Sequence, residues 1–213
     1  MTGIVICSGT IKDYTYYQKY FESTSSMLVI SVDGGAHHAR QLGFKVDVLL
    51  GDFDSISMED YRFYENAGVK IIRYPQAKDE TDTQLAVNYA IDNGCTSIYI
   101  LGGFGNRLDH SLANIFLLKK MTDRGVKGYI IDENNEITLI DKFIRLNKQE
   151  NTKVTLLPLT EKVEGITTKG LLYPLENATL EIGPSRGLSN EFIEDVAEVS
   201  IKKGLLLVIK ARD

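Results

Sequence analysis

Short runs of β-branched and other apolar residues alternate with longer stretches of helical spacing through the first 132 residues. The short runs have the length of strands, and the stretches between them have the apolar spacing of amphipathic helices. Alternation at this rhythm predicts a parallel sheet covered by helices on both faces. We predict strands at residues 4–7, 27–32, 46–50, 70–73, 97–101 and 127–132, and helices at 14–22, 36–42, 57–66, 82–92 and 110–124. In the last helix, an apolar stripe is expected from Leu112, Ile115, Phe116 and Leu118.

The pattern changes after Asp132, where residues 133–136 form a polar turn and no helical spacing follows. Shorter strand candidates come next, separated by glycines in the manner of antiparallel hairpins. These candidates are residues 137–140, 153–157, 178–182, 196–201 and 205–210. The predicted fold is therefore α/β: an N-terminal doubly wound, mostly parallel sheet domain at residues 1–133, then a smaller all-β sandwich domain at 134–213.

Composition and local sequence features argue against a nucleic-acid partner and against a membrane segment. The 24 basic and 29 acidic residues give a net charge of −5, which argues against a general nucleic-acid surface. No apolar run approaches the ~18 residues that a membrane helix needs, so no membrane segment is expected. The N-terminus begins with an apolar strand candidate, and we expect no signal peptide. Two cysteines without metal-ligand spacing indicate buried thiols in a reduced compartment, so we expect a soluble cytoplasmic protein.

Acidic residues gather after the carboxyl ends of the predicted strands. Asp33 follows the second strand, Asp52 and Asp54 follow the third, and Asp82 opens the helix after the fourth. Each has an ordinary structural explanation, since Asp33 could end a strand, Asp79 or Thr81 could cap a helix, and Asp82 could suit a first helical turn. Together, however, such carboxylates at one rim of a sheet repel one another unless a cation is present. Oxygen ligands of this kind suit Mg²⁺.

A glycine-rich loop follows the fifth predicted strand. Gly102 and Gly103 give the backbone room for close approach of a ligand, and the N–H groups can receive phosphate oxygens. Leu108 replaces the third glycine of a dinucleotide-binding motif, and the loop lacks the ending of a P-loop. Arg107 is either a solvated residue or a phosphate-binding group, and Asp109 could cap the helix that we expect to begin at His110.

The order of these motifs along the chain resembles the thiamin pyrophosphokinase family. The resemblance rests on D-G-G at 33–35, G-D-F-D-S at 51–55, D-x-T-D at 79–82, G-G-x-x-x-R-x-D at 102–109 and S-N at 189–190. It implies transfer of diphosphate from ATP to thiamin by an α/β nucleotide-binding catalytic domain followed by a thiamin-binding β-sandwich. It also implies a homodimer whose thiamin site lies between the α/β domain of one subunit and the β domain of the other.

The resemblance assigns roles to individual residues. Asp52, Asp54 and Asp82 would be linked to Mg²⁺, Asp33 would lie near the reacting groups, and Arg107 would hold phosphate. The remaining expected binding residues are Asp79, Thr81, Gly102, Gly103 and Asp109 for the nucleotide, and Ser189 and Asn190 for thiamin. The chain departs from eukaryotic members in one respect, because it has no tryptophan to stack on thiamin.

Two other functions remain open at this point. A nucleotide-sugar glycosyltransferase also uses a D-x-D metal motif, but it would leave residues 79–82 and the glycine-rich loop unexplained. A non-catalytic thiamin or nucleotide sensor would have no need of a metal cluster. In the favoured function, the thiamin hydroxyl attacks the β-phosphorus of ATP and expels AMP, with Asp33 as the candidate general base.

Overall fold

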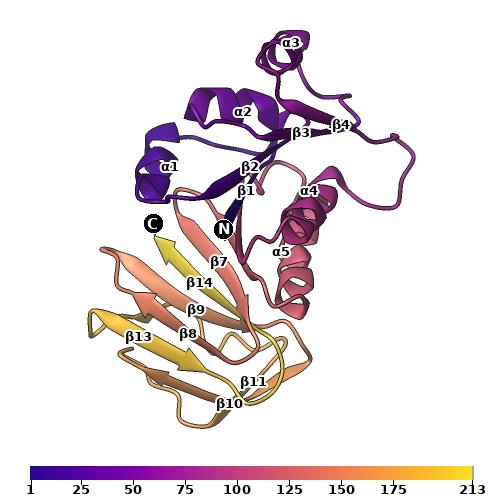
Figure 1. Cartoon of the computed structure of the whole chain (residues 1–213). Helices are drawn as coiled ribbons and strands as arrows, with labels where there is room; N and C mark the ends of the chain where they lie inside the picture. The colour runs from indigo at the N-terminus through magenta and orange to yellow at the C-terminus, as the bar shows by residue number, and fades with distance from the viewer. Residues whose placement is uncertain (213) are drawn as a thin grey trace. The chain divides into compact units, whose positions relative to one another are not determined.

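The computed structural model describes residues 1–212 and consists of two compact units, Met1–Glu133 and Asn134–Asp213 (Figure 1). The first unit contains six parallel strands in the order β6-β5-β1-β2-β3-β4. The strands are β1 (Thr2–Ile6), β2 (Met27–Val32), β3 (Val48–Gly51), β4 (Lys70–Arg73), β5 (Ser97–Leu101) and β6 (Lys127–Ile131). The helices between them are α1 (Tyr14–Phe21), α2 (Gly35–Leu42), α3 (Met58–Asn66), α4 (Asp82–Asp92) and α5 (Leu108–Asp123).

Both faces of this sheet are buried, as a parallel sheet requires. Alternate residues of one strand point to opposite faces, so Ile4 and Ile6 of β1 pack with side chains from α1, α2 and α3. Helix α4 contacts β1, β2 and β3, and α5 contacts β6 and α4. The predicted α/β class is confirmed, and β2, β4, β5 and α4 have the predicted bounds.

The chain reverses its direction across the sheet between β1 and β5. Strands β1 to β4 are added in one direction, and β5 and β6 then lie on the other side of β1. A doubly wound sheet binds its ligands in the crevice at such a switch point, outside the carboxyl ends of the strands. The topology therefore points to the loops that follow β1 and β5.

Side-chain caps begin three of the helices. Asp13 caps α1, Ser57 caps α3 and Thr81 caps α4, where its Oγ1 accepts a hydrogen bond from the N–H of Gln84 at 3.2 Å. The predicted cap at Asp109 is wrong. Helix α5 begins at Leu108, and Asp109 lies inside its first turn, so its carboxylate is placed to meet Arg107 instead.

The second unit is a pair of antiparallel sheets. One has the order β12-β9-β14-β7 and the other β11-β10-β13-β8. Side chains from both sheets, including Val154 and Val208 from one and Val163 and Val199 from the other, form one buried core. The strands are β7 (Asn135–Ile140), β8 (Phe143–Asn147), β9 (Thr152–Pro158), β10 (Lys162–Lys169), β11 (Ala178–Glu181), β12 (Asn190–Glu191), β13 (Val196–Ser200) and β14 (Leu206–Arg212).

Strands β8, β10 and β12 were not among the sequence predictions. In β10 the reason is Gly165, which we expected to separate two strands. It has φ +71° and lies where the register with β11 shifts between Glu164 and Ile166. A glycine in this conformation forms a bulge and lets the strand continue.

The predicted apolar stripe of α5 is wrong in part. Leu118 is fully buried, but Leu112 and Phe116 are 44% and 58% exposed. The buried side of α5 instead includes the polar residues Ser111 and Asn114. Leu108, Leu112 and Phe116 follow one another at four-residue intervals, so they form an exposed apolar stripe on α5.

Among residues 1–212, no helix is long and apolar enough to cross a membrane.

Candidate active site

Three carboxylates meet at the carboxyl ends of β2 and β3. Asp33 follows β2, Asp52 follows β3, and Asp82 opens α4; each offers an oxygen within 4.8 Å of the others. Asp33 is buried, whereas Asp52 and Asp82 are half-buried. This acidic group, Asp33, Asp52 and Asp82, is a set of hard oxygen donors of the kind that Mg²⁺ takes from a protein.

Asp54 lies outside this group. It is exposed, and its backbone N–H donates to Asp52 Oδ1 at 3.2 Å, while its Oδ2 accepts a hydrogen bond from Gln76 Nε2 at 3.4 Å. The residue between them, Phe53, has φ +65°, which a non-glycine residue seldom adopts. The turn therefore directs Asp52 and Asp54 differently, and the assignment of Asp54 to the metal stays a prediction.

Asp33 is held by the loop that follows β3. One of its carboxylate oxygens accepts a hydrogen bond from Ser55 Oγ at 2.8 Å, and the other accepts one from the N–H of Ile56 at 3.1 Å. Burial raises the pKa of Asp33, the hydrogen bond from Ser55 lowers it, and the neighbouring Asp54 raises it, with a net upward shift. A carboxyl with a raised pKa is better suited to accept a proton than an ordinary exposed one.

Lys78 lies against the acidic group and was missed by the sequence analysis. Its Nζ is 3.4 Å from Asp52 Oδ2 and 3.1 Å from Asp82 Oδ1, and its side chain is only 11% exposed. Burial lowers the pKa of Lys78, but Asp82 and Asp52 outweigh that effect, so the net shift is upward. The sequence does contain one signal for this ion pair, the four-residue spacing of Lys78 and Asp82. Such spacing predicts an ion pair within a helix, but Lys78 lies in the loop before α4, where the spacing by itself predicts no contact.

A pocket of ≈ 280 Å³ lies at the switch point between β1 and β5. Its wall includes Ser8 and Gly9 from the loop after β1, and residues 102–107 from the glycine-rich loop after β5. The two loops are joined by hydrogen bonds from Gly9 N to Gly102 O and from Thr10 N to Phe104 O, at 2.9 and 2.7 Å. The loop after β1 was also missed by the sequence analysis, since a Ser-Gly pair is common in ordinary turns.

Glycine is required where the two loops meet. A Cβ on Gly9 would lie 2.2 Å from the carbonyl oxygen of Phe104, and a Cβ on Gly102 would lie 2.5 Å from that of Cys7. Gly102 also has φ +60°, a conformation that favours glycine. Asn114 of α5 donates a hydrogen bond to Gly103 O at 2.7 Å, which fixes the loop on the helix.

Arg107 ends the glycine-rich loop and pairs with Asp109. Its Nη2 and Nε lie 2.6 and 3.2 Å from the two carboxylate oxygens, in the forked geometry of a guanidinium and a carboxylate. Both side chains are well exposed. The hydrogen bond from Arg107 lowers the pKa of Asp109 to about 2, so the pair is charged at neutral pH. Asp109 thus orients the guanidinium, which also lines the pocket.

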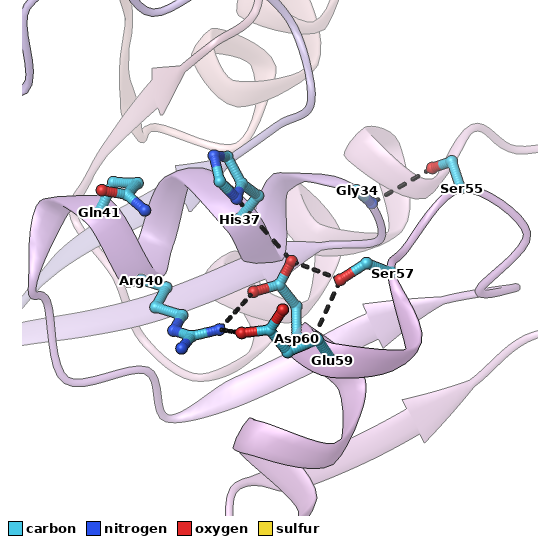
Figure 2. A pocket seen from close by; sticks show the side chains of 8 residues that line it. All are labelled: Gly34, His37, Arg40, Gln41, Ser55, Ser57, Glu59 and Asp60. Carbon is cyan, nitrogen blue, oxygen red and sulfur yellow. Dashed lines mark hydrogen bonds and ion pairs between the residues drawn. The ribbon is translucent and has the colours of Figure 1, made fainter.

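A second, polar pocket of ≈ 480 Å³ lies between α2 and α3 (Figure 2). At its base the buried Asp60 accepts hydrogen bonds from Ser57 Oγ at 2.7 Å and Arg40 Nη1 at 3.3 Å. Its lining includes Ser55, which also donates to Asp33. This pocket therefore borders the acidic group, because Ser55 lines the pocket and also contacts Asp33.

The two predicted thiamin contacts in the second unit have different environments. Ser189 is exposed and has φ +56°. Asn190 is buried, and its carboxamide accepts from the N–H groups of Tyr173 and Glu191 and donates to the carbonyl of Tyr173, at 3.0, 2.9 and 2.7 Å. The Asn190 side chain is thus occupied in holding the segment around Tyr173, and Tyr173 itself is 65% exposed. The predicted contacts of both residues with thiamin stay predictions.

Asp79 and Thr81 lie in the loop between β4 and α4. Asp79 is exposed, and Thr81 is the cap of α4. The structure therefore brings together Asp33, Asp52 and Asp82 at one point, and Gly102, Gly103 and Arg107 at another.

Comparison with known proteins gives two matching family models. "Thiamin pyrophosphokinase, catalytic domain" matches residues 17–130, and "Thiamin pyrophosphokinase, vitamin B1 binding domain" matches residues 142–206. The chain is 34% identical to a thiamine pyrophosphokinase of Bacillus subtilis (strain 168) over 188 residues, which is 87% of this chain and 88% of the relative.

Solved structures agree with the sequence comparisons. A crystal structure of thiamine pyrophosphokinase from Bacillus subtilis is similar with a TM-score of 0.90 and 31% identity, and 100% of each chain is covered. One of thiamin pyrophosphokinase from Geobacillus thermodenitrificans is similar with a TM-score of 0.87 and 27% identity, covering 100% of this chain and 98% of that one.

The fold and the site define a two-unit protein with an acidic group and a glycine-lined pocket at the binding edge of its doubly wound sheet. The chain belongs to the thiamin pyrophosphokinase family.

The contact between the two glycine-lined loops leads to a first prediction. Gly9→Ala should lower the free energy of unfolding by about 1–3 kcal/mol, because its methyl group would overlap backbone oxygens that cannot move independently. Gly105→Ala is the matched control, since its Cβ would lie an ordinary 3.4 Å from Gly9 Cα. Denaturant unfolding of the two variants measures the difference. Equal stability would mean that the loops separate more easily than their hydrogen bonds indicate.

Proposed function

We propose that this protein transfers diphosphate from ATP to the hydroxyl of thiamin, giving thiamin diphosphate and AMP. The observation that carries this proposal is the acidic group of Asp33, Asp52 and Asp82 beside a glycine-lined pocket, in a chain of the thiamin pyrophosphokinase family. Diphosphate transfer needs alignment and charge neutralisation more than covalent help from the protein, and the two features offer these.

We assign Mg²⁺ to Asp52, Asp54 and Asp82. Two of these already share the acidic group, and Asp54 lies two residues from Asp52 on the same turn. The fit is supported by Asp82 Oδ1, a buried oxygen whose ion-pair partner is the Lys78 ammonium at 3.1 Å, so this oxygen already faces a positive charge. Bound there, Mg²⁺ would neutralise charge on the polyphosphate.

The protein's own groups have the following roles in this proposal. The thiamin hydroxyl oxygen forms a bond to the β-phosphorus, the bond between that phosphorus and the α–β bridging oxygen breaks, and AMP leaves. Asp33 is the candidate to accept the hydroxyl proton, supported by its raised pKa. Arg107 would pair with phosphate oxygens, oriented by Asp109. Asp79, Thr81, Gly102 and Gly103 complete the nucleotide side.

Cys7 takes no part in this chemistry. The thiol is buried at the edge of the pocket, and burial raises its pKa to about 11, so it is protonated and unreactive at neutral pH. Cys7 and Cys95 are both free and buried, which fits a reduced compartment, and we propose a cytoplasmic location.

We further propose a homodimer in which each thiamin site is shared. Ser189 and Asn190 of one chain would face the α/β unit of the other. The exposed stripe of Leu108, Leu112 and Phe116 supports an association of chains, because contiguous exposed apolar side chains mark interaction surfaces.

The bond that breaks distinguishes this function from others. We expect AMP and thiamin diphosphate in equal amounts when the protein is incubated with ATP, Mg²⁺ and thiamin. Chromatography of the nucleotides measures the product. Thiamin-dependent release of ADP would indicate an ordinary kinase, and binding without any nucleotide product would favour a sensor. Turnover of a nucleotide sugar without use of ATP would favour a glycosyltransferase.

The proposed contact of Arg107 with phosphate can be tested by substitution, with Arg124 at the other end of α5 as the control. Arg107→Ala should lower kcat by at least ~10², because charge that develops on the transferred group loses its partner. Arg107→Lys should recover only part of this, since an ammonium cannot reproduce the forked contact. Arg124→Ala, at the other end of α5, is the control and should retain activity. A loss of less than about threefold in both Arg107 variants would identify Arg107 as a solvated loop residue.

The shared site can be tested by mixing chains. Asp82→Asn damages the α/β side, and Ser189→His adds bulk at an exposed position whose left-handed conformation histidine tolerates. Each homodimer should be weak, but random pairing after co-refolding at equal ratio puts both lesions into one site of a mixed dimer and leaves the other intact. About a quarter of wild-type activity should then return, measured as AMP release after size exclusion confirms dimers. If mixing restores nothing, each site belongs to one chain.

A further inference from the structure

The ammonium of Lys78 stands where a cation would be needed. It lies 3.4 Å from Asp52 and 3.1 Å from Asp82, two of the three members of the acidic group. The carboxylates are 13% and 19% exposed, so solvent screens their repulsion only in part. A positive charge between them lowers that repulsion, and Lys78 supplies it from within the chain.

The segment that carries Lys78 is attached to the acidic turn by polar contacts. Lys78 Nζ also donates to the carbonyl oxygen of Pro75 at 3.0 Å. Arg73 Nη1 donates to the carbonyl oxygen of Asp52 at 3.1 Å, and Gln76 Nε2 donates to Asp54 Oδ2 at 3.4 Å. Residues 75–77 are exposed and contribute nothing to the buried core. Contacts of this kind exchange readily with water, so the segment can leave the carboxylates without unpacking the fold.

A divalent cation and the ammonium compete for the same oxygen atoms. Asp82 Oδ1 accepts no hydrogen bond and has the ammonium at 3.1 Å as an ion-pair partner. A cation bound to Asp52 and Asp82 would meet a positive charge at this distance, and like charges so close repel strongly. Both cannot occupy the site at once.

We propose that Lys78 is the internal counter-ion of the metal-free site, and that a divalent cation binds by displacing its ammonium from Asp52 and Asp82. This inference rests on the metal site of the proposed function. The displaced ammonium stays beside the site on its short loop, where polyphosphate oxygens give it a new partner. Lys78 therefore makes the cation bind weakly alone and more tightly with a nucleotide.

Titration calorimetry with Mg²⁺ alone, without nucleotide, tests the competition. Lys78→Met keeps a long side chain but removes the charge, and we expect its Mg²⁺ affinity to rise by about tenfold, or about 1.4 kcal/mol. Lys78→Arg keeps a competing cation and should retain the weak wild-type affinity. Lys70→Met is the matched control: it removes a lysine charge from the opposite end of β4, where Nζ bonds to Tyr89 Oη.

A second measurement uses the wild-type protein and does not depend on a variant that folds. Acylation of lysines followed by mass spectrometry should label Lys78 slowly without metal and faster at saturating Mg²⁺, while exposed Lys70 changes little. Unchanged or weaker affinity in Lys78→Met would overturn the proposal, as would an equal gain in Lys70→Met, undetectable Mg²⁺ binding in every variant, or continued protection of Lys78 in the metal-bound protein. Neither measurement uses turnover, so failure of the AMP assay would leave this result standing.

Discussion

The repulsion among Asp33, Asp52 and Asp82 is the constraint around which the α/β unit is organised. Parallel strands end at one edge of the sheet, so the residues that follow β2 and β3 and open α4 must meet there. Like charges at such distances raise the free energy of the folded state unless a cation or a proton compensates them. Asp33 and Phe53 both have positive φ, at 44° and 65°, which places backbone strain beside these charges. Strain and repulsion at one point are typical of a site kept for binding rather than for stability.

The glycine-lined pocket depends on a different constraint, the close approach of two backbones. The loops after β1 and β5 meet because the sheet reverses direction between these strands. Gly9 and Gly102 permit the contact, since any side chain there would overlap a carbonyl oxygen. The hydrogen bond from Asn114 explains why a polar residue faces the sheet on α5. The topology thus forms the pocket, and Gly9 and Gly102 keep its two loops in contact because they have no side chain.

The second unit contributes rigid segments more than free polar groups. The carboxamide of Asn190 is committed to the backbone of Tyr173 and Glu191, and so holds the backbone from which the exposed Tyr173 ring projects. In a chain without tryptophan, an aromatic ring at this position offers a flat apolar surface. Asn190 of the S-N motif therefore has a local structural role, and this role is compatible with the predicted contact with thiamin.

Local sequence patterns predicted the α/β class, the bounds of β2, β4, β5 and α4, a helix cap at Asp79 or Thr81, and the candidate residues Asp33, Asp52 and Asp82. Each follows from residue spacing or from chemistry within a few residues. Only the tertiary structure decided that Lys78 pairs with the carboxylates, that Gly9 supports the glycine-rich loop, that Gly165 continues a strand, and that Leu112 is exposed. These features depend on which strands and loops become neighbours, and periodicity along a chain carries no information about contacts between segments far apart in it.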